Sequence, residues 1–239
     1  MYNISTRGGI LMNTKEIENN ITFEDEMYGQ IKRKINYAKE LNISTKELMH
    51  IEQIKCNYLK HVNNSPTKCN IVYETNNNVS NIFTSKLDVK EESIYILEAA
   101  SVILKYLYEL LPDNVTISNI NFEDILNKEN KTKLEENIIK LAFYLLMPVD
   151  KLSLEEENLI RDYTLNNEDI SWYRKLFIYN LSKKYNLPES VIDKKLKLIA
   201  QTNNYDLFIN NFLLGKQEVL YKDDNKLIDR RSLMLNIIK

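Results

Sequence analysis

The sequence predicts a mainly helical α+β fold, in which a small antiparallel sheet near residues 69–97 accompanies a bundle of helices. Two observations lead to this prediction. Along most of the 239 residues, apolar side chains recur at the three- and four-residue spacing of amphipathic helices. Residues 69–84 are instead rich in β-branched and aromatic side chains, which favour strands, and three consecutive asparagines divide them into two halves.

Helices are expected before the sheet. The segment Glu24–Glu40 has apolar residues at helical spacing. Ser44, followed three residues later by Glu47, forms a capping box and predicts a second helix that runs to about Leu59. Turn-forming residues at 63–66 close this segment.

Two strands are expected, Cys69–Glu74 and Val79–Thr84, joined as a hairpin through Asn76–Asn78. Asparagine tolerates the positive φ that such a turn requires, so the turn does not need glycine. The segment Ser93–Leu97 is open to two interpretations, a third strand or the lead-in to a helix.

Helices are expected again after the sheet. A strongly apolar helix at Leu97–Leu111 ends before Pro112, and an amphipathic helix at Lys131–Met147 ends before Pro148. The remaining helices expected are an acidic one capped by Ser153, one from Asp169 or Ser171 through Tyr185, one at Glu189–Ala200, and two final stretches, one of which Gly215 ends.

The composition excludes several classes of enzyme. Only four glycines are present, at positions 8, 9, 29 and 215, so no window supplies the glycine-rich loop of a phosphate- or dinucleotide-binding site. The only cysteines are Cys56 and Cys69, which excludes a disulfide framework and a cysteine zinc site. His50 and His61 would lie too far apart on one helix to share a metal.

A cytoplasmic protein without a membrane partner is expected. The first 20 residues contain no apolar stretch of the kind found in a signal peptide. The longest apolar stretch, Ile96–Leu111, contains Glu98, Lys105 and Glu109, which a bilayer would not accommodate cheaply.

Charge is strongly segregated along the chain, although the net charge is only −2. Residues 31–68 carry eight basic and three acidic side chains, residues 88–169 carry eight and eighteen, and residues 172–239 carry thirteen and seven. Solvated helix faces explain such segregation. Alternatively, the basic ends bind an acidic partner or nucleic acid, or they pack against the acidic middle.

One helix end resembles a known family. The segment Ala142–Pro148, with the sequence AFYLLMP, is similar to the F-A-A-x-L-L-M-P ending found in ImmA/IrrE zinc metallopeptidases. Tyr95–Ile103 is similar to the upstream helix that carries the family's H-E-x-x-H motif, and Leu181–Leu196 is similar to a later segment. The resemblance covers about residues 69–199 and implies a zincin-like peptidase core.

The resemblance also implies that the metal site is lost. In the family, two histidines four residues apart and a glutamate on a second helix hold zinc, and a glutamate between the histidines activates water. These ligand positions fall on Ala99, Ile103 and Asn137, and the position of the base falls on Ala100. None of these residues can do the family's chemistry, so we expect no enzyme, no metal and no cofactor. The former site is expected to be filled as core or to form a small apolar groove.

The function expected from this resemblance is non-catalytic. It is that of a regulatory or protein-interaction protein of a mobile element or prophage. Such a protein would bind another protein, for example a repressor or a phage protein, without proteolysis.

The alternative is a DNA-binding transcriptional regulator that uses the basic N- and C-terminal helices. Helix-turn-helix spacing occurs twice, at Ala38-Asn42-Leu48 and at Ser182-Asn186-Ile192. The first motif carries Glu47 and Glu52, which would repel phosphate. The possible contacts to a partner or to nucleic acid are the neighbouring basic residues Lys32, Arg33, Lys34, Lys183, Lys184, Lys194 and Lys195.

These observations divide the chain into three segments. Residues 1–68 form a helical segment that weakly resembles a helix-turn-helix. Residues 69–170 form the peptidase-like core, and residues 171–239 form a C-terminal helical segment.

Overall fold

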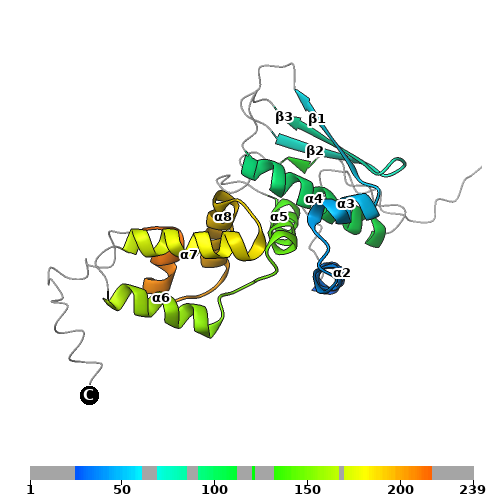
Figure 1. Ribbon diagram of the computed structural model, residues 1–239. Helices are drawn as coiled ribbons and strands as arrows, with labels where there is room; N and C mark the ends of the chain where they lie inside the picture. The colour runs from blue at the N-terminus through cyan, green and yellow to red at the C-terminus, as the bar shows by residue number, and fades with distance from the viewer. Residues whose placement is uncertain are drawn as a thin grey trace, which may run out of the picture. The chain divides into compact units, whose positions relative to one another are not determined.

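The computed structural model describes residues 25–60, 69–84, 91–111, 120–121, 132–166 and 170–216. The chain forms two compact units, divided after Pro148 (Figure 1). The described elements of the first unit are α2 (Asp25–Glu40), α3 (Thr45–Ile51), β1 (Lys55–Lys60), β2 (Cys69–Glu74), β3 (Val79–Thr84), α4 (Glu91–Leu110), β4 (Ile120–Asn121) and α5 (Lys133–Leu146). Those of the second unit are α6 (Leu154–Asn166), α7 (Ile170–Tyr185), α8 (Glu189–Thr202) and α9 (Leu207–Leu214).

The first unit contains a four-stranded sheet with the strand order β1-β3-β2-β4. Strands β2 and β3 pair antiparallel, and Asn78 in their turn has a φ of 50°, which confirms the hairpin. Strand β1 pairs parallel with β3, so the sheet is mixed and the expectation of an antiparallel sheet is wrong. The mainly helical α+β class is confirmed.

The helix expected to run to about Leu59 ends much earlier. Helix α3 ends at Ile51, and Gln53, with a φ of 55°, reverses the chain so that the next residues enter β1. The sequence of β1, KCNYLK, has no strong preference of its own, and pairing with the ready-made hairpin decides its conformation. The segment Ser93–Leu97 lies within α4, so its interpretation as a strand is also wrong.

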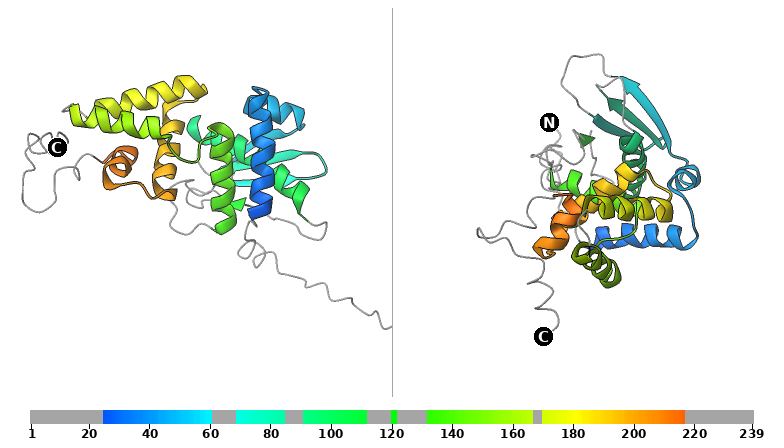
Figure 2. Two further views of the ribbon diagram at one scale, coloured as in Figure 1. Left: turned by 90° about the horizontal axis from the view of Figure 1, so that it is seen from below. Right: turned by 60° about the vertical axis from the view of Figure 1, so that its left-hand side comes forward.

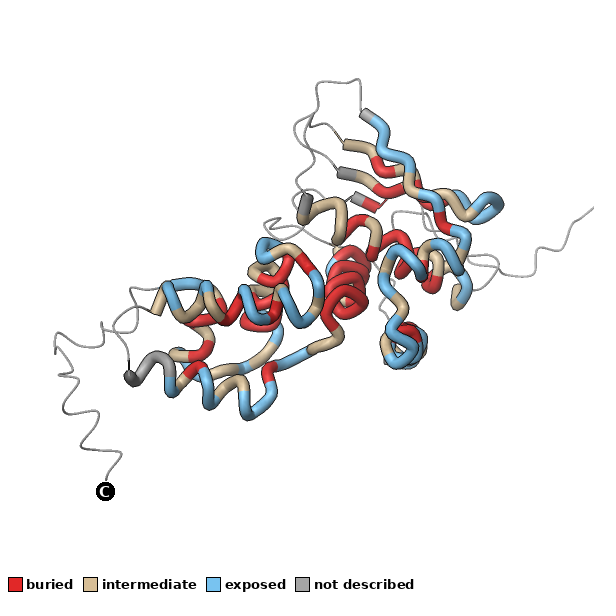
Figure 3. The backbone as a smooth tube through the Cα atoms, in the orientation of Figure 1, coloured by how far each residue is buried: buried red, intermediate tan, exposed pale blue. Residues whose placement is uncertain are grey.

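Helix α4 packs against one face of the sheet. The Tyr58 hydroxyl of β1 donates a 2.9 Å hydrogen bond to Glu98 of α4. The ring of Tyr73 on β2 stacks on Tyr108 of α4, with ring centroids 5.3 Å apart. Helices α2 and α5 also pack on α4 and lie side by side (Figure 2). Most residues of α5 are buried, so α4 and α5 form the centre of the first unit (Figure 3).

Local signals in the sequence set most helix ends. Capping boxes are present at Ser44, as expected, and at Thr132, which precedes the first residue of α5. The Ser153 hydroxyl accepts from the backbone N–H three residues later, as expected for the start of α6. Gly215 ends α9 with a φ of 72°. The turn expected at residues 63–66 and any helix beyond residue 216 lie outside the described residues.

The two units do not coincide with the three segments expected from the sequence. The first expected boundary, after residue 68, separates β1 from β3, yet these two strands are paired. The second, after residue 170, cuts the first turn of α7. The contacts of the structure instead place the division after Pro148, where α5 has ended.

Arg174 connects three helices of the second unit. Its guanidinium donates hydrogen bonds of 2.7 Å to the carbonyl oxygens of Phe212 and Leu213 at the end of α9. It also donates to Asp193 of α8 at 2.6 Å. The last carbonyls of a helix lack the donors of a following turn. The Gly215 N–H donates to the Phe212 carbonyl, and the Arg174 side chain adds a second donor there and a donor to the Leu213 carbonyl.

The Arg174→Ala variant is therefore expected to lose about 2 kcal/mol in the free energy of unfolding of the second unit, because it removes one of the two cations that pair with the partly buried Asp193 and the side-chain donor to two carbonyls. Arg161 pairs with Asp206 in an exposed position, and its alanine variant is the matched control, with an expected loss below about 1 kcal/mol. Urea unfolding followed by the fluorescence of the single tryptophan, Trp172, measures both. Equal losses in the two variants would contradict the bridging role.

Candidate functional site

The positions that the resemblance aligns with a zinc site lie inside the first unit. Ala99, Ala100 and Ile103 of α4 are fully buried, and Asn137 of α5 is half-buried. The neighbouring apolar residues of α4, from Ile96 to Leu107, are buried as well. Full burial favours a filled core over the alternative of a small apolar groove.

These residues do not fit a zinc ion. Alanine and isoleucine side chains carry no lone pair, and structural and catalytic zinc sites are built from cysteine, histidine and carboxylate ligands. Among the described residues, no three His, Cys, Asp or Glu side chains come close enough together to hold a metal ion.

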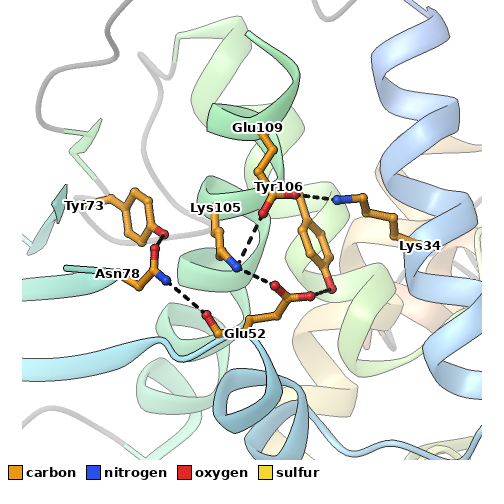
Figure 4. A network of polar contacts seen from close by, with 7 residues as sticks. All are labelled: Lys34, Glu52, Tyr73, Asn78, Lys105, Tyr106 and Glu109. Atoms are coloured by element: carbon orange, nitrogen blue, oxygen red, sulfur yellow. Dashed lines mark hydrogen bonds and ion pairs between the residues drawn. The ribbon is translucent and has the colours of Figure 1, made fainter. Parts of the chain in front are cut away.

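A different set of polar side chains is brought together where α2, α3 and α4 meet (Figure 4). The Lys105 ammonium lies 2.5 Å from Glu52 and 3.4 Å from Glu109, and Glu109 also binds Lys34 at 2.5 Å. The Tyr106 hydroxyl donates to Glu52 at 3.2 Å, and the Lys34 ammonium lies 4.4 Å from the centre of the Tyr106 ring. These five residues form a closed circuit of contacts, which we call the charge ring.

The charge ring shifts the pKa values of Glu109, Lys105 and Tyr106. Partial burial alone would raise the pKa of Glu109, but hydrogen bonds and charges from Lys34 and Lys105 outweigh it and lower the pKa below its usual value. Burial would lower the pKa of Lys105, and Glu52 and Glu109 reverse this and raise it. Burial and the charge of Glu52 raise the pKa of Tyr106. Two ammonium groups face two carboxylates, so the ring is neutral and offers no uncompensated charge to a ligand.

The chemistry of the charge ring is therefore structural: it ties the α3–β1 junction to α4 and α2. The amide of Asn78, which accepts from the Tyr73 hydroxyl at 2.9 Å and donates to the Glu52 carbonyl at 3.5 Å, extends it to the hairpin. The charge ring was not predicted from the sequence. The spacing of Lys105 and Glu109 by four residues is a visible signal, whereas Glu52 is 53 residues from Lys105 and carries none.

The basic residues expected on the first unit are partly occupied by contacts within it. The Lys32 ammonium lies 4.8 Å and 4.5 Å from the ring centres of Tyr28 and Tyr144. Lys34 belongs to the charge ring, and Arg33 is exposed. These three residues therefore do not form one open basic patch.

The basic residues expected on the second unit differ in accessibility. Lys183 and Lys184 of α7 are exposed, and Lys194 of α8 is half-buried. Lys195 is only 3% exposed, so it cannot contact a ligand at the surface of this unit. The four residues therefore divide between an accessible pair on α7 and a less accessible pair on α8.

The two stretches with helix-turn-helix spacing have different surroundings. In the second, Asn186 turns the chain with a φ of 51°, the Ser182 hydroxyl donates to the Leu187 carbonyl at 2.6 Å, and Ile192 is fully buried. In the first, Asn42 also has a positive φ, but the seven-residue α3 leads into a strand and Ile51 at its end is 59% exposed. Of these two described stretches, only the second consists of two full-length helices, α7 and α8, joined by such a turn.

Comparisons with family models, with curated proteins and with solved structures found no match to this chain. The resemblance to ImmA/IrrE metallopeptidases therefore stays a prediction. In the described part of the chain, no helix combines the length and the apolar character that crossing a membrane requires.

The charge ring predicts a pH-dependent contribution to stability. The folded pKa of Glu109 lies below its ordinary value of 4.5, so its stabilisation is present above about pH 4.5 and is lost as the pH falls through the folded pKa. Because Glu109 is well exposed, Glu109→Gln is expected to lower the free energy of unfolding by at most about 1 kcal/mol at pH 7, and by less near pH 3. Urea unfolding followed by circular dichroism at both pH values measures the difference.

The matched control makes the same substitution in a chain that carries Lys34→Met and Lys105→Met, where it is expected to have little effect at either pH. An effect of Glu109→Gln that is the same at both pH values, or the same in the control chain, would show that the ring does not hold the carboxylate ionised.

Proposed function

We propose that this protein is a non-catalytic regulatory or protein-interaction protein built on a scaffold like that of ImmA/IrrE metallopeptidases. It binds a protein partner, such as a repressor or another protein of a prophage or mobile element, without cutting it. The observation that carries the proposal is the full burial of Ala99, Ala100 and Ile103. The helix that would present catalytic groups presents methyl and methylene groups to a packed interior instead.

The arrangement of the first unit is compatible with this origin. The helix with the former ligand positions, α4, is the next described element after β3 and lies against the sheet. The helix with the LLMP ending, α5, packs on α4, and it ends at Leu146 just before Pro148. Replacing polar ligands by apolar residues stabilises such a core by about 25 cal/mol for each Å² of apolar surface removed from water. A core of this kind can therefore stay folded after the catalytic and metal-binding residues have been replaced.

A protein of this kind acts by binding its partner and covering part of the partner's surface. It has no group positioned to attack a peptide bond in the former site, so its effect on a partner depends on how much of the partner's surface it covers and for how long. The specificity of such an effect lies in surface side chains, and the interior of α4 and α5 supplies the rigid support for them.

A second candidate function is DNA binding through α7 and α8. It is favoured by the turn at Asn186, whose positive φ and buried neighbours Leu187 and Ile192 join two helices in the manner of a helix-turn-helix. The exposed Lys183 and Lys184 of α7 would contact phosphates. Binding to duplex DNA that weakens steeply with salt would distinguish this function from the first.

The non-catalytic proposal predicts that full-length protein purified from zinc-supplemented cells contains far less than one zinc ion per chain. Its melting temperature is expected to be unchanged by a chelator, and it is expected not to cleave fluorescent casein. Plasma mass spectrometry, thermal unfolding and a fluorescence assay measure the three properties. One zinc ion per chain, with chelation lowering the melting temperature or stopping cleavage, would contradict the proposal.

A further inference from the structure

Helix α7 has one exposed face of mixed aromatic and basic character. Trp172, Lys175, Tyr179 and Lys183 follow one another at spacings of three, four and four residues, and all four are exposed. We call these four residues the α7 face. The opposite side of the helix carries Phe177, Ile178 and Leu181, which are buried in the second unit. The helix therefore uses one side for its core and presents the other outward.

All the charged residues of the α7 face are basic. The 16 residues of α7, ISWYRKLFIYNLSKKY, contain no acidic side chain. Arg174 is occupied by the end of α9 and by Asp193. Within the described part of the chain, Lys175 and Lys183 have no carboxylate partner. Their charges are therefore available to an external anion.

The aromatic residues of the α7 face are large and accessible. Trp172 is 53% exposed and Tyr179 is 46% exposed. Tryptophan and tyrosine contribute most to affinity in protein interfaces, because they bury a large area at a small loss of conformational entropy. With lysines between them, they match a surface that presents carboxylates beside apolar groups.

We propose that the α7 face binds an acidic, partly apolar helical segment of a partner protein. This inference rests on the proposed function, whose partner it assigns to a chemical class. Carboxylates of the segment pair with Lys175 and Lys183, which are about 12 Å apart along the helix, while its apolar side chains cover Trp172 and Tyr179.

The rings favour a protein segment over a single-stranded nucleic acid. Stacking of bases needs an open ring face. One face of Tyr179 is covered by the Lys183 ammonium, 5.2 Å from the ring centre. Trp172 is in edge contact with Tyr173, with ring centroids 4.9 Å apart. Lysines, rather than arginines that could stack on bases or read their edges, are the exposed cations of this face.

The experiment uses Trp172, the only tryptophan of the chain, as an internal reporter. Full-length protein is titrated with a capped helical peptide of about 16 residues, made of glutamate, leucine and alanine so that glutamate and leucine share one face. We expect saturable changes in the intensity and wavelength of its fluorescence, and weaker binding at about 0.5 M salt. A peptide with glutamine in place of glutamate is expected to bind at least about tenfold more weakly.

Charge reversal locates the binding. In the double variant K175E/K183E, affinity for the glutamate peptide is expected to fall at least about tenfold. The control K46E/K151E reverses two exposed lysines elsewhere and changes the net charge equally, and its affinity is expected to stay within about twofold. Circular dichroism checks that both variants are folded.

Three results would overturn the inference: no binding of the glutamate peptide, equal weakening in both double variants, or tighter binding of single-stranded DNA than of the peptide. The last result would assign the face to nucleic acid. If the peptide does not bind, the zinc measurement of the proposed function is unaffected. If the protein contains zinc, the proposed function is contradicted, but the peptide-binding result still holds. The two failures are therefore distinguishable.

Discussion

The structure of the first unit depends on the burial of α4. Its apolar residues pack against the sheet and against α5, and α2 and α3 contact its remaining sides. A helix that is apolar over most of its surface is stable in water only when it is enclosed in this way. The enclosure leaves no room for an open site at Ala99, Ala100 and Ile103. The burial of α4 therefore stabilises the first unit and also leaves no accessible surface at these three residues.

Polar contacts at the edge of the first unit also hold neighbouring elements against α4. The charge ring joins Lys34 of α2 and Glu52 at the end of α3 to α4, and it does so with balanced charges. In the second unit, Arg174 has the corresponding role between α7, α8 and α9. Both sets of charges are used internally. The side chains that remain available to a partner lie on the outward side of helices such as α7. The proposed activity is therefore binding.

Local sequence signals predicted much of this fold. Ser44 with Glu47, the hairpin asparagines and Gly215 act within a few residues of themselves, so pattern and capping chemistry were sufficient. The conformation of β1 depends on a partner strand more than twenty residues away, and it was wrongly expected to be helical. The pairing of Glu52 with Lys105 is equally non-local. That the residues aligned with the zinc site cannot bind zinc is a prediction from their side-chain chemistry alone, which requires no knowledge of tertiary contacts.

The most direct test of the central claim is the stability of Ile103→Ala. If Ile103 of α4 is enclosed in the core of the first unit, its truncation leaves a cavity, and the free energy of unfolding of this unit is expected to fall by about 2–5 kcal/mol. Ile51→Ala, at an exposed position of the same unit, is expected to cost about 0.5 kcal/mol or less. Urea unfolding followed by circular dichroism compares them. Equal, small losses in both variants would contradict the account, because Ile103 would then line an accessible surface.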